Sequence, residues 1–111
     1  MIQAGEIYFI PKGVVIGKVD YGRPCLVLRV SKHDATVCYF STKTDNREPG
    51  QVAIWATDPD FKASGLRASS FIIDDFTEDV KLEFFHGAIF WGHANGQFKL
   101  DVEDWYGLPL I

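Results

Sequence analysis

The chain of 111 residues lacks the features that mark membrane, secreted and metal-binding proteins. It has no apolar run of about 18 residues, the length that a membrane-spanning helix requires. Its two cysteines, Cys25 and Cys38, are too few for a disulfide framework and fit a reducing compartment. The cysteines and the three histidines also lack the spacing of a metal site. We therefore expect a cytoplasmic protein with no membrane partner, no metal and no cofactor.

Basic charge is scarce as well. Eleven Lys and Arg stand against 15 Asp and Glu, and the net charge of −4 argues against a simple nucleic-acid binder. The charges are unevenly spread, because residues 1–67 carry +2 and residues 68–111 carry −6. A basic-leaning first part can hold a phosphate chain while the acidic part faces elsewhere, although ordinary surface variation would give the same figures.

Aromatic residues, by contrast, are abundant: nine Phe, four Tyr and three Trp favour a β-rich interior. Runs of β-branched and aromatic residues between turn residues predict strands over 6–10, 24–30, 35–42, 51–56, 66–73 and 88–93. No repeat, low-complexity segment or linker divides the chain, so we expect residues 1–111 to form a single domain. The pattern predicts a mainly β fold, either a small barrel or a sandwich, with one or two short helices.

The segment 74–87 allows two interpretations. Phe76, Val80 and Phe84 recur at the spacing of a helix. The stretch VKLEF (80–84), however, alternates apolar and charged residues as a strand does.

The C-terminal third contains a strong local turn signal. Asn95 and Gly96 predict a type I′ hairpin with residues 97–100 as the returning strand. Residues 101–107 predict one short helix, and the loop 57–65 has room for one helical turn.

Two apolar runs, PCLVLRV (24–30) and ATVCYFST (35–42), predict a buried hairpin that turns at Lys32 and His33. Alternate residues of the first run form two apolar faces. With a two-residue turn, the expected pairs are Ser31 with Asp34, Leu28 with Val37, and Leu26 with Tyr39.

The open end of this hairpin carries groups suited to phosphate binding. In that register Arg23 faces Thr42, and with a loop one residue different it faces Ser41. A guanidinium beside a hydroxyl can hold phosphate oxygens and stabilise the charge that builds on them during phosphodiester cleavage. The plain alternative is an arginine at a strand entry with hydroxyls in a turn.

Four stretches in this order resemble the MazF/PemK-like toxins of bacterial toxin–antitoxin modules. They are GEIYFI (5–10), GRPCLVL (22–28), TVCYFST (36–42) and GLRASSFI (65–72), and together the resemblance covers roughly residues 4–74. It implies a small SH3-like barrel of the MazF/CcdB toxin type. It also implies a homodimeric toxin that cuts single-stranded RNA without a metal. A cognate antitoxin protein is the implied partner of this toxin.

The resemblance also assigns roles to residues of this chain. The family's catalytic Arg and Thr fall on Arg23 and Ser41, with Thr42 as the alternative one residue along. The loop 11–22 corresponds to the family's flexible loop beside the RNA groove. The expected substrate-binding residues are Lys12, Lys18, Tyr21, Lys43, Arg67, Ser69 and Ser70.

The sequence departs from the family at Ser41, where the family has Thr, and in the segment from Phe76 onward. Two further interpretations therefore stay open. One is a catalytically degraded binding module, or a toxin that targets a protein, on the same barrel. The other is a plain SH3-like interaction domain.

The remaining polar and aromatic candidates have structural interpretations. His33 is expected to fill the turn, and His86 and His93 to act as structural donors that flank a buried strand. An aromatic group is expected mostly in the core, or in part as a partner surface; it comprises Phe84, Phe85, Phe90, Trp91 and Trp105.

Overall fold

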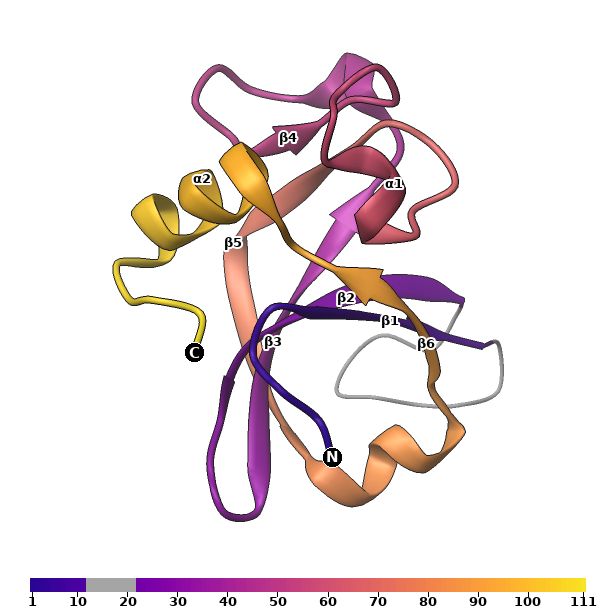
Figure 1. The fold of residues 1–111 in the computed structure, drawn as a ribbon, viewed down its shortest axis with the longest axis vertical. Coiled ribbons are helices and arrows are strands. Elements are labelled where there is room, and N and C mark those ends of the chain that lie inside the picture. The colour runs from indigo at the N-terminus through magenta and orange to yellow at the C-terminus, as the bar shows by residue number, and fades with distance from the viewer. Residues whose placement is uncertain (12–21) are drawn as a thin grey trace.

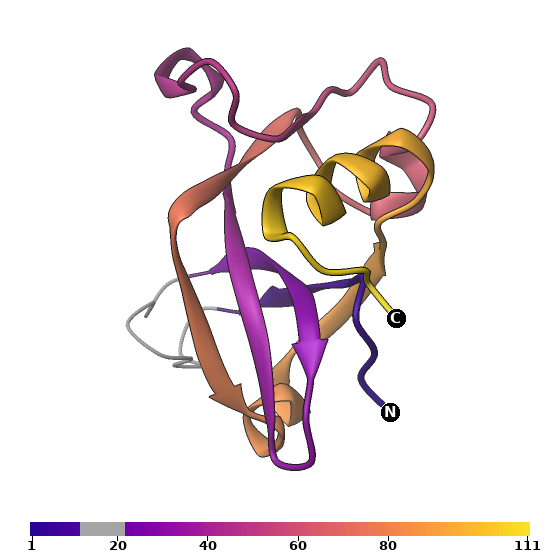
Figure 2. The same cartoon turned by 90° about the vertical axis from the view of Figure 1, so that its left-hand side faces the viewer.

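The computed structural model describes residues 1–11 and 22–111, and within them one strongly curled antiparallel sheet dominates (Figure 1). The strands are β1 (Glu6–Ile10), β2 (Arg23–Val30), β3 (Asp34–Ser41), β4 (Ala53–Ile54), β5 (Ser70–Lys81) and β6 (Ile89–His93). Their order in the sheet is β4-β5-β3-β2-β1-β6. The helices are α1 (Phe61–Ser64), α2 (Gly96–Tyr106) and the 3₁₀ turns η1 (Thr44–Asn46) and η2 (Leu82–Gly87). The mainly β prediction is confirmed, and the sheet curls into a half-barrel (Figure 2).

The central strands β2 and β3 are buried on both faces, which explains their almost unbroken apolar runs. One set of alternate residues forms the helix-side core, beneath α2, and includes Leu26, Leu28 and Phe40. The other set forms the η2-side core and includes Val27 and Tyr39. The two predicted apolar faces of the hairpin are therefore both real.

The turn of the β2–β3 hairpin is confirmed, but its register changes along the strands. The N–H of Ser31 donates to the carbonyl of Asp34 at 2.8 Å, as a two-residue turn requires. A bulge then follows, since Arg29 pairs with Thr36 whereas Val27 pairs with Val37. The predicted pairs Leu28–Val37 and Leu26–Tyr39 are wrong, because the extra residue in β2 shifts every later pair by one.

The ambiguous segment 74–87 is not an α-helix. Its first part continues β5, where Asp79 accepts a 2.6 Å hydrogen bond from the hydroxyl of Thr36 on β3. Its second part is the 3₁₀ turn η2, which buries Phe85 in the η2-side core. Pairing with a long neighbouring strand therefore prevails over the helical spacing.

The hairpin predicted at Asn95 and Gly96 is wrong, because these residues begin α2. The Asp60 carboxylate lies so close that a Cβ at Gly96 would be 2.1 Å from its Oδ1 atom. The same carboxylate accepts the Phe98 N–H at 3.4 Å, near the N-terminus of the helix. Gly96 therefore serves a close approach rather than a hairpin turn.

Two further elements differ from the prediction in extent. The strand expected over 51–56 is reduced to β4, and the strand expected over 66–73 begins only at Ser70. The one helical turn allowed in 57–65 is present as α1. No helix in the described parts of the chain is both long and apolar enough to cross a bilayer.

Candidate functional site

The open end of the β2–β3 hairpin does not stay paired. The two strands pair as far as Cys25 and Tyr39. Beyond this point β2 continues beside β1, with Arg23 opposite Ile10, and β3 continues beside β5, with Ser41 opposite Phe71 (Figure 1). Neither Ser41 nor Thr42 is thus the sheet partner of Arg23, as either predicted register would have required.

The structure instead gathers Arg23, Tyr39 and Glu78 into what we call the strand-end cluster. Tyr39 is fully buried in the η2-side core, and Glu78 enters from β5 opposite Val37. Burial and then the Glu78 carboxylate raise the pKa of the Tyr39 phenol, whereas the Arg23 guanidinium lowers it. Both charges therefore act on one hydroxyl, which stays protonated and able to donate at neutral pH.

Sequence reasoning missed Tyr39 and Glu78. Tyr39 occurs in an apolar run and reads as core. Glu78 belongs to a segment whose helix or strand state the local pattern left open. Only the pairing of β3 with β5 brings the two residues together.

The two predicted hydroxyls differ in position. Ser41 is half-buried and lies two residues beyond Tyr39, and alternate residues of a strand share a face. Its Oγ accepts the N–H of Lys43 at 3.1 Å, and a hydroxyl that accepts a hydrogen bond can still donate its own hydrogen. Thr42 and Lys43 are exposed beyond the end of β3. Ser41 therefore lies nearer to the strand-end cluster along the strand than Thr42 does.

The other predicted serines have structural contacts. Ser69 Oγ accepts the N–H of Ala56 at 2.8 Å, and Ser70, which is buried, donates its hydroxyl to the carbonyl of Ala68 at 2.8 Å. Both bonds hold the loop before β5 in place. The predicted residues Lys12, Lys18 and Tyr21 lie outside the described residues.

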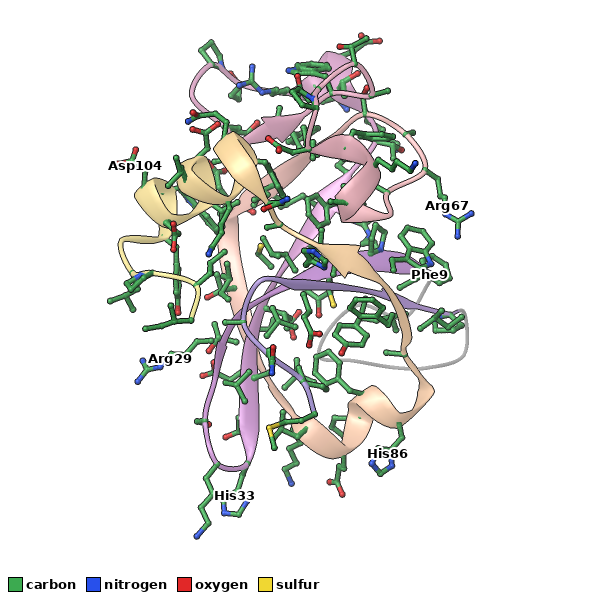
Figure 3. All side chains as sticks on the ribbon, in the orientation of Figure 1. Phe9, Arg29, His33, Arg67, His86 and Asp104 are labelled. Carbon is green, nitrogen blue, oxygen red and sulfur yellow. The ribbon has the colours of Figure 1, made fainter. Side chains whose placement is uncertain are left out.

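Arg67 belongs to a group on the β6 side of the molecule that we call the aromatic stack. Its Cζ atom lies 4.8 Å from the centre of the Trp91 ring, and Phe9 stacks on the same indole at 4.7 Å with an interplanar angle of 10°. Arg67 and Phe9 lie on the same side of the molecule in Figure 3. Gly65 lets the chain before Arg67 lie close to the backbone of β6, because a Cβ at Gly65 would be 2.1 Å from the Trp91 carbonyl oxygen.

The histidines take no part in either group. His33 is exposed in the hairpin turn, as expected. His86 and His93 are exposed, so the expectation that they are structural donors beside a buried strand is not supported. Cys25 and Cys38 are buried free thiols on β2 and β3. In residues 1–11 and 22–111, no three His, Cys, Asp or Glu side chains are grouped as a metal ion needs.

The predicted aromatic core is only partly buried. Phe85 is in the η2-side core, and Trp91 and Trp105 pack partly against the helix-side core. Phe84 and Phe90 are exposed, with 45% and 52% of their surface accessible. Ile89, beside Phe90 on the edge strand β6, is 51% exposed. Phe84 and Phe90 therefore belong to the surface of the molecule and not to its core.

Comparison with known proteins does not assign the chain to a family. No protein-family model matches the chain, and no curated protein matches it either.

Proposed function

We propose that the protein is a toxin of a toxin–antitoxin module that acts as a metal-independent endoribonuclease on single-stranded RNA. The observation that carries the proposal is the strand-end cluster, in which a cation and a carboxylate act on one buried phenol. The resemblance of residues 4–74 to the MazF/PemK-like toxins supports it, with Arg23 as the matching arginine.

The cluster contains the groups that RNA cleavage through the ribose 2′-hydroxyl requires. Glu78 takes the proton from the 2′-oxygen as that oxygen attacks phosphorus. Arg23 stabilises the negative charge that develops on the phosphoryl oxygens. Tyr39 is fully buried, so its phenol positions the Arg23 and Glu78 side chains and does not contact the RNA. The bond to the 5′-oxygen breaks, a water molecule gives that oxygen a proton and takes the proton held by Glu78, and a 2′,3′-cyclic phosphate remains.

Ser41 contributes a second hydroxyl to this scheme. It binds a phosphoryl oxygen in the place of the family's threonine, while Lys43 adds positive charge at the exposed end of β3. Ser41 is thus a binding residue in this scheme, and the proton transfers belong to Glu78 and water.

The aromatic stack supports a single-stranded substrate. Bases that are not paired expose flat faces, which stack on aromatic rings and on guanidinium planes. Arg67 is exposed, and Trp91 and Phe9 are half-buried. We propose that one base of the RNA stacks on this group while the scissile phosphate lies at the strand-end cluster.

The edge strand β6 supports a protein partner. Ile89 and Phe90 are half-exposed on a strand that ends the described sheet, and such edges are sites of pairing. We propose that this edge serves the homodimer or the antitoxin that the resemblance implies. The buried reduced thiols support a cytoplasmic location.

An RNA cleavage assay in EDTA tests the proposal. We expect the wild type to produce fragments with cyclic-phosphate ends, and Arg23→Ala to reduce the rate roughly 100-fold or more, since it removes the charge that stabilises the transition state. Arg29→Ala is the matched control, because Arg29 is exposed farther along the same strand (Figure 3). No cleavage by the wild type, or equal cleavage by Arg23→Ala, would refute the ribonuclease.

The second candidate is a catalytically degraded binding module or a protein-targeting toxin on the same fold. The exposed apolar edge of β6 favours it. Growth arrest on expression without RNA decay, together with no cleavage in the assay, would select this candidate.

A further inference from the structure

A cavity lies away from the strand-end cluster, between α2 and the chain around β4. Its volume is about 680 Å³. We call it the acidic cleft; its polar and aromatic lining comprises Arg47, Gln51, Trp55, Asp58, Asp60, Gln97, Phe98, Asp101, Asp104 and Trp105. Four carboxylates and one guanidinium give this lining a formal charge of −3. Such a lining repels phosphate and attracts cations.

The cleft already holds one guanidinium against an indole. The Arg47 Nε and Nη2 atoms both donate to the carbonyl of Gln51. This anchorage places the Arg47 Cζ atom 6.0 Å from the centre of the Trp55 ring. A guanidinium over the face of an indole is therefore a contact that already occurs in the cleft.

Three of the four carboxylates accept hydrogen bonds from the protein. Asp58 accepts the N–H of Trp55 at 2.7 Å, and Asp60 accepts the N–H of Phe98 at 3.4 Å. Asp101 accepts a hydrogen bond from the side-chain amide of Gln97, one turn earlier on α2, at 2.8 Å. Both Asp101 and Asp104 are exposed on α2, and Figure 3 shows Asp104 at the surface. They are three residues apart, so they share one face of the helix.

Trp105 completes that face of α2. It follows Asp101 by four residues, lines the cleft and is half-buried against the helix-side core. One indole wall and two neighbouring carboxylates make up the contacts that a guanidinium favours. A lysine ammonium lacks the flat face that stacks on the indole.

The position of β4 at the end of the sheet favours a peptide as the molecule whose guanidinium enters the cleft. β4 is the last strand in the order of the described sheet, and the chain at 50–53 lines the cleft. Strands at the end of a sheet can accept extended peptides through their main chain. We propose that the acidic cleft binds an arginine side chain of a basic peptide, with its guanidinium on Trp105 and its N–H groups on Asp101 and Asp104.

Indole N–H signals in NMR spectra test the proposal, because the chain has three tryptophans and two of them line the cleft. The probe is a blocked Ala-Arg-Ala peptide, titrated into the full chain. We expect saturable shifts of the Trp55 and Trp105 signals and a stationary Trp91 signal, which reports the aromatic stack. Shifts of Trp91 alone, or of no indole, would overturn the proposal.

Matched peptides and variants sharpen the test. The same peptide with citrulline, which is neutral, should bind at least tenfold more weakly, and so should the arginine peptide to the double variant Asp101→Asn, Asp104→Asn. Glu83→Gln removes a negative charge from the exposed surface of η2 and should leave binding within twofold. Equal binding of citrulline, of spermidine, or to the double variant would refute an arginine peptide as the ligand. None of these results depends on ribonuclease activity.

Discussion

The strand-end cluster and the acidic cleft are made of the same kinds of group but have different charge balances. Each places an arginine near an aromatic ring and at least one carboxylate. In the cluster one arginine and one glutamate, Arg23 and Glu78, act on Tyr39, whereas in the cleft one arginine meets four aspartates. The net charge of −4 therefore describes neither region. A protein that is acidic on average can still present a local site that tolerates phosphate.

The largest expected effect is on the strand-end cluster. Glu78→Gln should lower the RNA cleavage rate by roughly 10²–10⁴-fold, because the amide cannot take the 2′ proton. Single-turnover cleavage in EDTA measures the rate.

The control for this variant is Glu83→Gln, which removes the same charge from an exposed site on η2. Circular dichroism should show that both variants are folded. If Glu78→Gln keeps more than half of the wild-type rate, Glu78 is not the base.

The acidic cleft depends instead on how α2 is anchored. Phe98 is 4% exposed in the helix-side core and its ring centre lies 6.3 Å from that of Phe40. Phe98→Ala should lower the free energy of unfolding by about 3–5 kcal/mol, through lost burial and a cavity. Urea denaturation measures the change.

Leu100→Ala is the matched control on the same helix, because Leu100 is 58% exposed. Its effect should stay within about 0.5 kcal/mol. Similar losses for the two variants would show that α2 is not anchored through Phe98.

The physical reason for the missed register lies in the two buried faces of the hairpin. Where one face of a strand is solvated, a slip of one residue exposes apolar side chains, so the pattern specifies the register. Val27 and Leu28 are both buried, on opposite faces. If β2 slips by one residue along β3, Val27 and Leu28 exchange faces and both stay buried. The alternation therefore predicts the strands and the Lys32–His33 turn but not the bulge.

The other missed features depend on contacts that are distant in the sequence. Asn95 and Gly96 carry a strong local turn signal, but Asp60 contacts this point from another part of the chain. Glu78 likewise meets Tyr39 only through the pairing of β5 with β3. In the candidate site, Arg23 was found from its local motif, whereas its partners needed the fold.

The sheet between the two regions should lose stability at high pH. Burial raises the pKa of the Cys25 thiol from its ordinary 9.0 to about 12, and burial raises the pKa of Cys38 as well. The folded state favours the neutral thiols, so their stabilisation is complete below pH 9 and is lost as the pH rises towards 12. Each thiol should contribute a slope of about 1.4 kcal/mol per pH unit in that window.

Urea midpoints measured between pH 8 and pH 10.5 check this expectation. Cys25→Ala should flatten the dependence above pH 9, because one titrating thiol is removed. An unchanged slope in this variant would show that the Cys25 thiol does not titrate differently in the folded and unfolded states.

The smallest expected effect separates the two hydroxyls at the end of β3. Ser41→Ala should slow RNA cleavage by about 10–100-fold, the usual cost of one hydrogen bond to a charged group. Ser41→Thr keeps the hydroxyl and should stay within about threefold of the wild type, whereas Thr42→Ala should have no measurable effect because Thr42 lies exposed beyond the strand. A larger loss for Thr42→Ala than for Ser41→Ala would transfer the phosphate contact to Thr42. It would also mean that the chain between β3 and η1 approaches Arg23 more closely when RNA is bound.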